Sequence, residues 1–153
     1  MSWVTLLFSP EGRVNRLHFW LGWLVLFGAG FVLMWIPFLG HIVILLSLYS
    51  HICVYSKRLH DMGRSGWWQV FPLVTAFALP IAGLVMGGAD IFAHLHDFND
   101  GGGFWVLLRA FGWFAAGLAV SCLIWGLFVL WIGLSSSQPG ENRYGPPAPT
   151  TLL

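Results

Sequence analysis

The sequence predicts an all-α, polytopic membrane protein with four transmembrane helices, and its composition and its long uncharged runs both point to that fold. The 153 residues are 58% hydrophobic and 8% charged, and the mean hydropathy is +0.77. A soluble domain carries about 25% charged residues, so this chain has too few to cover a water-exposed surface. The net charge is only +1, whereas a nucleic-acid-binding protein carries a strongly basic surface. We therefore expect no nucleic-acid partner.

The first two spans lie in one uncharged run. From Phe19 to Tyr55, 37 residues contain no Asp, Glu, Lys or Arg. Because a spanning helix needs about 20 residues, this run is long enough for two helices. Pro37 and Gly40 supply the break between them, so we expect a tight hairpin.

Two further apolar runs follow and predict a second hairpin. A glycine-bracketed polar insert, residues 87–103, separates them as an outer loop. Residues 135–153 are rich in Ser, Pro and Gly and predict an irregular cytoplasmic tail. The four spans are expected near residues 19–36, 41–57, 66–86 and 111–134.

Small residues indicate where the helices of the second hairpin pack. Gly83 and Gly87 form a GxxxG pair in the third span, and Gly112 with Ala116 forms a second small pair in the fourth span. Such pairs let two helix backbones approach closely in a membrane. We therefore expect both pairs to lie at helix contacts.

The cations predict the orientation of the four spans. Six of the 7 cations fall on one side of the membrane in this arrangement, whereas Arg109 lies on the other side with Asp90, Asp97 and Asp100. The positive-inside rule then places both termini in the cytoplasm. The six cytoplasmic cations are Arg13, Arg16, Lys57, Arg58, Arg64 and Arg143.

The most informative polar stretch is residues 58–68, which reads as a helix end, a turn and a helix start. Gly63 is suited to the left-handed position that ends a helix. Asp61 lies three residues from both Arg58 and Arg64. We expect it to pair with Arg58 directly and with Arg64 across the turn.

Two more polar elements are predicted on the same side. Ser9-Pro10-Glu11 is typical of a helix start, and a helix beginning there would carry Arg13 and Arg16 straight into the first span. The tail contributes Gly140-Glu141-Asn142-Arg143-Tyr144-Gly145-Pro146. The three polar elements are therefore expected on one membrane face.

These three motifs, in this order along the chain, carry a resemblance. Gly12-Arg13…Arg16…Trp20, the stretch 58–68 and the stretch 140–146 resemble the bacterial inner-membrane family known as domain of unknown function 805, the YhaH/YhaI-like proteins. The resemblance covers nearly the whole chain. It implies a small multi-pass protein of the bacterial inner (cytoplasmic) membrane whose function is not established, and it supplies no catalytic residues. The insert 87–103 is longer than the connection expected in that family.

The leading functional hypothesis is a non-enzymatic module that binds a protein partner or an anionic membrane lipid through this face. An arginine cluster at headgroup level can hold a phosphate. The competing interpretation is that the charges only pair with Glu11, Asp61 and Glu141. The candidate binding residues are Arg13, Arg16, Arg58, His60, Asp61, Arg64, Trp67, Trp68, Asn142 and Arg143.

Two other classes of function are considered. Ser47, His51 and Tyr55 give the second span one polar helical face, which favours a small transporter or channel working as a homo-oligomer. The structural alternative is an interior histidine whose polar atoms are hydrogen-bonded within the protein. The third class is a lipid-headgroup enzyme using His60 and Asp61. Adjacent helical residues point about 100° apart, so we predict no catalytic site.

The outer insert contains residue types that ligate metals. His94, His96 and Asp97 lie close together in the sequence, and imidazole and carboxylate are common ligands. The group has no defined partner elsewhere in the chain. We therefore prefer a solvated acidic loop, and we assign neither a metal site nor a cofactor.

Overall fold

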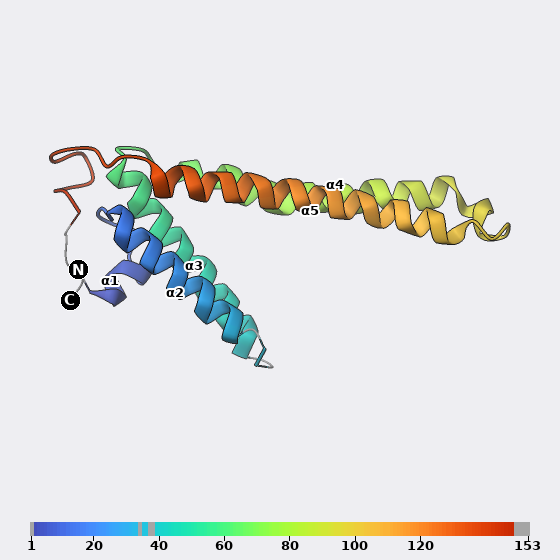
Figure 1. Ribbon diagram of the computed structural model, residues 1–153, viewed down its shortest axis with the longest axis horizontal. Coiled ribbons are helices and arrows are strands. Elements are labelled where there is room, and N and C mark those ends of the chain that lie inside the picture. Colours follow the sequence, from blue (N-terminus) through green and yellow to red (C-terminus); the bar gives the residue numbers. More distant parts are fainter. Residues whose placement is uncertain (1, 34, 37–38, 149–153) are drawn as a thin grey trace. The chain divides into compact units, whose positions relative to one another are not determined.

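The computed structural model describes residues 2–33, 35–36 and 39–148, and every regular element within them is helical (Figure 1). Four of the described helices are long and apolar enough to cross a membrane. The predicted all-α, multi-pass membrane fold is thus confirmed, while Pro37 of the predicted turn lies outside the described residues. The helices are α1 (Trp3–Phe8), α2 (Arg16–Leu33), α3 (Leu39–Asp61), the short 3-10 helix η1 (Gly66–Gln69), α4 (Val70–Ala93), the 3-10 helix η2 (Leu95–Phe98) and α5 (Gly103–Leu134).

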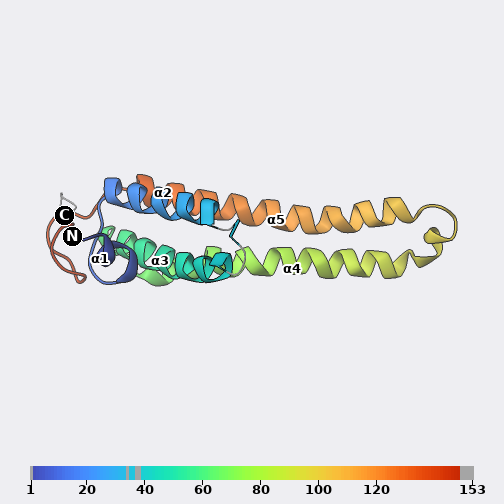
Figure 2. The ribbon, with the colours of Figure 1, turned by 90° about the horizontal axis from the view of Figure 1, so that it is seen from below.

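The chain divides into two compact units. Unit 1 comprises residues 1–69 and 130–153, and unit 2 comprises residues 70–129. Within unit 1, α2 and α3 lie side by side, and α1 packs against α3 (Figure 1). Within unit 2, α4 and α5 form the second hairpin, closed by the loop that contains η2 (Figure 2).

The N-terminal segment differs from the sequence prediction. Residues 9–15 are not helical, so the expected helix from Ser9 into the first span is wrong. Gly12 adopts a left-handed φ of 89°, which interrupts a right-handed helix. The side chain of Asn15 accepts a hydrogen bond from the backbone N–H of His18 at 2.8 Å and starts α2 one residue later, as N-cap residues do.

The end of α3 follows the prediction closely. Gly63 has a φ of 72°, which confirms its left-handed role. The N–H of Gly63 donates to the carbonyl of His60 at 2.9 Å, and the N–H of Arg64 donates to that of Leu59 at 2.8 Å. This pair of bonds is the Schellman arrangement that satisfies the last helical carbonyls. α3 continues four residues beyond residue 57, the expected end of the second span, and ends just before Gly63 as predicted.

Close backbone contact joins α4 and α5 in unit 2. A Cβ added to Gly83 would lie 2.4 Å from the carbonyl oxygen of Trp113, and one added to Gly87 would lie 2.7 Å from that of Ala110. The GxxxG prediction is confirmed, because only glycine permits this approach. The predicted contact at Gly112 is wrong: nothing lies within 4 Å of a Cβ added there.

The glycine on α5 that does make such a contact is Gly117. A Cβ added to it would lie 2.4 Å from the carbonyl oxygen of Leu79 on α4. Helix packing also shortens the outer loop, since α4 continues to Ala93 and α5 begins at Gly103. Gly87 therefore belongs to the helix contact and does not open the loop.

Candidate functional site

Asp61, the last residue of α3, is held by two arginines inside unit 1. Its Oδ1 accepts a hydrogen bond from Nε of Arg13 at 3.1 Å, and its Oδ2 accepts one from Nη1 of Arg58 at 2.5 Å. All three side chains are at most 1% exposed. The predicted pairing with Arg58 is confirmed, and the pairing with Arg64 is wrong because Arg13, in the non-helical segment before α2, supplies the second guanidinium.

Arginines also satisfy carbonyl groups at the end of α5. The last four carbonyls of a helix have no partner within it and carry partial negative charge. Arg58 donates from Nε to the carbonyl of Ile132 at 2.8 Å and from Nη2 to that of Ser135. Arg16 donates to the same Ser135 carbonyl at 2.9 Å. The end of α5 is thereby fixed to the start of α2 and the end of α3.

The tail after α5 lies against the end of α3. The N–H of Gln138 donates to the carbonyl of Asp61 at 2.8 Å, and Nδ2 of Asn142 donates to the carbonyl of His60 at 3.0 Å. The ring of Tyr144 stacks on the imidazole of His60, with centroids 3.8 Å apart and planes 8° apart. The N-terminal, central and C-terminal motifs of the sequence therefore meet at one end of unit 1.

Lys57 is also buried in unit 1, although from the sequence it indicated only the orientation of the spans. Its Nζ donates to the carbonyl oxygens of Thr5 and Leu6 at the end of α1, the latter at 2.9 Å, and the residue is fully buried. Cys53 and Val54, four and three positions earlier on α3, are buried too. That helical spacing is the signal that places Lys57 on the inner face.

Burial divides the predicted binding residues into two groups. Of the predicted set, Arg13, Arg58 and Asp61 are buried, and so is Lys57, which was not in that set. Arg13 and Arg58 bind the carboxylate of Asp61, whereas the backbone carbonyls of Thr5 and Leu6 accept hydrogen bonds from Lys57. These buried charged groups form hydrogen bonds inside the protein. For Asp61, this is what the competing interpretation of the sequence predicted.

Arg64 belongs to the exposed group and contacts aromatic rings. Its guanidinium carbon lies 5.3 Å from the ring centroid of Trp68 and 5.1 Å from that of Trp131. Such contacts between a cation and an indole face are attractive. Trp67 and Trp68 are 80% and 52% exposed. This Arg64–Trp surface, defined by Arg64, Trp67 and Trp68, remains open to a ligand.

The adjacent His60 and Asp61 do not face a common space. Nδ1 of His60 lies 3.3 Å from the carbonyl oxygen of Gly12, and its ring is covered by Tyr144. The carboxylate of Asp61 is enclosed by two guanidinium groups. Their polar atoms therefore meet different partners within the protein.

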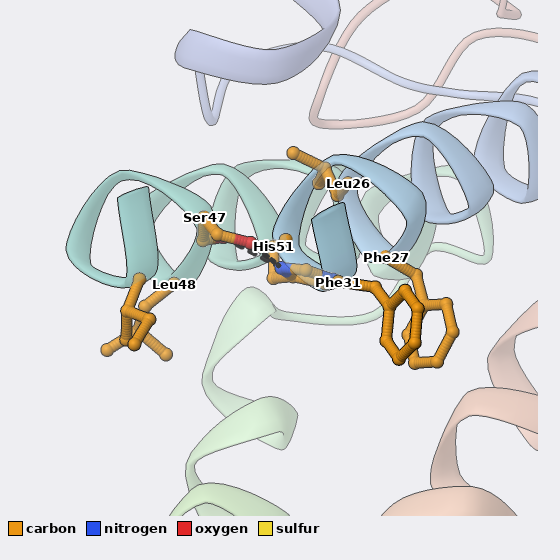
Figure 3. A pocket seen from close by; sticks show the side chains of 8 residues that line it. Leu26, Phe27, Phe31, Ser47, Leu48 and His51 are labelled. Atoms are coloured by element: carbon orange, nitrogen blue, oxygen red, sulfur yellow. Dashed lines mark hydrogen bonds between the residues drawn. The ribbon is translucent and has the colours of Figure 1, made fainter. Parts of the chain in front are cut away.

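The polar face of α3 borders an apolar groove of about 400 Å³ between α2 and α3 (Figure 3). Nδ1 of His51 lies 2.7 Å from the backbone carbonyl of Ser47 and 3.3 Å from its hydroxyl. A carbonyl only accepts hydrogen bonds, so Nδ1 carries the hydrogen. Tyr55 is 1% exposed and its ring lies 5.7 Å from that of His51. The groove is lined by Leu26, Phe27, Gly30, Phe31, Ile44, Ser47, Leu48 and His51.

The histidines near the outer loop pair locally with carboxylates. Nδ1 of His94 lies 3.2 Å from Asp90, and Nε2 of His96 lies 2.8 Å from Asp97. Asp90 also binds Nε of Arg109 at 3.2 Å. Within the part of the chain that the structure describes, no three His, Cys, Asp or Glu side chains are grouped to hold a metal ion.

Comparison with known proteins places this chain among uncharacterised relatives. Residues 7–146 match the model of a family described as "Protein of unknown function (DUF805)". The chain is 32% identical over 147 residues to "Uncharacterized protein YiiR" of Escherichia coli (strain K12), covering 91% of this chain and 85% of that protein. The same identity and coverage hold for "Uncharacterized protein YiiR" of Escherichia coli O157:H7. No solved structure matches the chain.

Proposed function

The chain belongs to the DUF805 family of proteins of unknown function. For this member of the family, we propose a non-enzymatic membrane module that binds the phosphate of an anionic lipid headgroup. The binding surface is the Arg64–Trp surface. The membrane is the bacterial inner membrane, and the positive-inside rule puts this surface on its cytoplasmic side.

The observation that carries the proposal is the availability of Arg64. Arg13 and Arg58 donate to Asp61 and to backbone carbonyls. Arg64, in contrast, makes no side-chain hydrogen bond or salt bridge with the residues that the structure describes, and the contacts of its guanidinium are with the rings of Trp68 and Trp131. A guanidinium held in this way keeps its N–H donors for the oxygens of a phosphate.

The position of Arg64 in the chain supports a lipid as the ligand. It lies in the short connection between α3 and η1, and candidate membrane spans stand on both sides of that connection. Such a connection lies at the membrane surface, where tryptophans gather and lipid phosphates are found. The exposure of Trp67 and Trp68 suits this depth.

The test measures how much phosphatidylglycerol the intact protein retains in native mass spectrometry from mild detergent. Arg64→Gln should lower the retained lipid about tenfold, because a hydrogen bond to a charged group contributes about 1.5 kcal/mol. Arg109→Gln is the matched control, since Arg109 is an exposed arginine of α5 in unit 2. Equal retention by both variants would refute the proposal. A stoichiometric protein lost only from Arg64→Gln would indicate a protein partner instead.

A small oligomeric transporter or channel is the second candidate, favoured by the polar pair of Ser47 and His51 in the apolar groove. With Nδ1 protonated, Nε2 of His51 can accept a proton, which is the chemistry of a proton path. Four helices of this size rarely enclose a pathway alone, so transport needs an oligomer. A monomer in mild detergent would count against this candidate.

A further inference from the structure

A polar cavity of about 420 Å³ lies between the end of α3 and the tail. It is lined by Gly63, Gln138, Glu141, Asn142 and Arg143. This volume is within the range of small-molecule sites, about 300–1,000 Å³. Arg64 is not among the lining residues, although its chain neighbour Gly63 is, so the charged side chains of the cavity are other than that of the Arg64–Trp surface.

Two opposite charges line this cavity without neutralising each other. Glu141 and Arg143 form no salt bridge with one another, and neither side chain makes a hydrogen bond within the described part of the chain. The guanidinium carbon of Arg143 lies 4.7 Å from the ring centroid of Tyr144. Glu141 and Arg143 are both exposed, and an open cavity with one carboxylate and one guanidinium is complementary to a ligand that carries both a cation and an anion.

The backbone between these two charges is fixed by local bonds. Nδ2 of Asn142 donates to the carbonyl of His60 at 3.0 Å and to Oε1 of Gln138 at 3.1 Å. Its Oδ1 accepts from the N–H of Tyr144 at 2.9 Å. Asn142 and Gly145 close the turn by backbone bonds of 3.2 and 2.9 Å. A site ordered before binding loses less conformational freedom when the ligand arrives.

Gly63 allows the tail to form the floor of the cavity. A Cβ added to Gly63 would lie 2.2 Å from Oε1 of Gln138, so the glycine admits the side chain that Asn142 then holds. Gly63 lies two residues beyond Asp61, where the candidate span of α3 ends, so we expect the cavity to open at the membrane surface. The ligands present at that depth are lipid headgroups.

We propose that this cavity binds a phosphoethanolamine group, with its ammonium at the carboxylate of Glu141 and its phosphate at the guanidinium of Arg143. The proposal rests on the proposed function, a module that binds lipid headgroups, and adds a second site with zwitterionic specificity. The group can come from phosphatidylethanolamine or from soluble phosphoethanolamine. The Arg64–Trp surface keeps the anionic lipid.

The experiment compares retention of phosphatidylethanolamine and phosphatidylglycerol by the full chain in mild detergent, read by native mass spectrometry. Glu141→Gln and Arg143→Gln should each lower retention of phosphatidylethanolamine at least about fivefold, because each removes one charge-assisted contact. Retention of phosphatidylglycerol should stay unchanged in Glu141→Gln. Glu11→Gln is the matched control, an exposed glutamate of the same unit.

The outcomes separate this proposal from the proposed function. Unchanged retention of phosphatidylethanolamine in both cavity variants overturns the zwitterion site, whatever Arg64→Gln does to phosphatidylglycerol. Loss in the cavity variants but not in Glu11→Gln supports it, even if Arg64→Gln has no effect. Soluble phosphoethanolamine, added as a competitor, identifies the source of the bound phosphoethanolamine group. Displacement of the lipid shows that the headgroup alone is enough for binding. No displacement assigns the site to the membrane lipid.

Discussion

Replacing Asp61 by asparagine tests whether the buried charge cluster holds unit 1 together. Asp61→Asn keeps the shape of the side chain and removes the one buried carboxylate among the described residues, leaving Arg13, Lys57 and Arg58 as buried cations. The lost contacts are two guanidinium–carboxylate bonds of 3.1 and 2.5 Å at 1% exposure or less. Breaking such a buried pair costs about 3–5 kcal/mol. For a chain of this size, that lowers the melting temperature by about 6–20 °C.

The assay is thermal unfolding of the purified protein in mild detergent, followed by circular dichroism. Asp97→Asn is the matched control, because its side chain is 32% exposed and, among the residues that the structure describes, pairs with His96 alone. Exposed pairs of this kind contribute about 1 kcal/mol or less, so the control should melt within a few degrees of the parent. If Asp61→Asn melts no lower than Asp97→Asn, the argument that this carboxylate holds the arginines in place is wrong.

Two further predictions concern helix packing and the tail. Gly83→Ala should destabilise the protein by about 1–3 kcal/mol in denaturant titration, because overpacking displaces the facing helix. The control is Gly112→Ala, where nothing lies within 4 Å of an added Cβ, and its stability should stay within about 0.5 kcal/mol of the parent. Equal effects of the two substitutions would contradict the close contact at Gly83. Tyr144→Ala removes the ring that stacks on His60. This variant should be cleaved by trypsin after Arg143 about fivefold faster, since such a stack contributes about 1 kcal/mol. An unchanged cleavage rate would show that the stack does not hold the tail.

Local features of the fold were predictable wherever neighbouring residues decide them. Gly63 was predicted to end α3 in the left-handed conformation, and its φ is 72°. The GxxxG pair was predicted to mark a helix contact, and Gly83 lies there. The start of α2 was missed, because Ser9-Pro10-Glu11 is typical of a helix start, whereas Asn15 caps the helix in the structure.

The sequence identified the motifs that meet at the end of unit 1 but not how their side chains are arranged. The sequence indicated that Arg13, Arg58, Asp61 and Arg64 gather on one membrane face. It did not show which arginine binds Asp61, because Arg64 is three residues away and Arg13 is 48 residues away. Lys57 was missed as a buried residue because a positive charge near a helix end also satisfies the positive-inside rule.

The sequence by itself determined that this is an all-helical membrane protein with four spans, because hydropathy, helix-ending glycines and small-residue pairs act over a few neighbouring residues. Only the tertiary structure decided which charges are buried and which stay open. Arg58 reaches the carbonyl of Ser135, 77 residues away, and so ties the end of α5 and its tail to α3, whereas Arg64 remains on the aromatic surface. Burial depends on segments that are distant in the chain, and a charge removed from water needs acceptors that those segments supply.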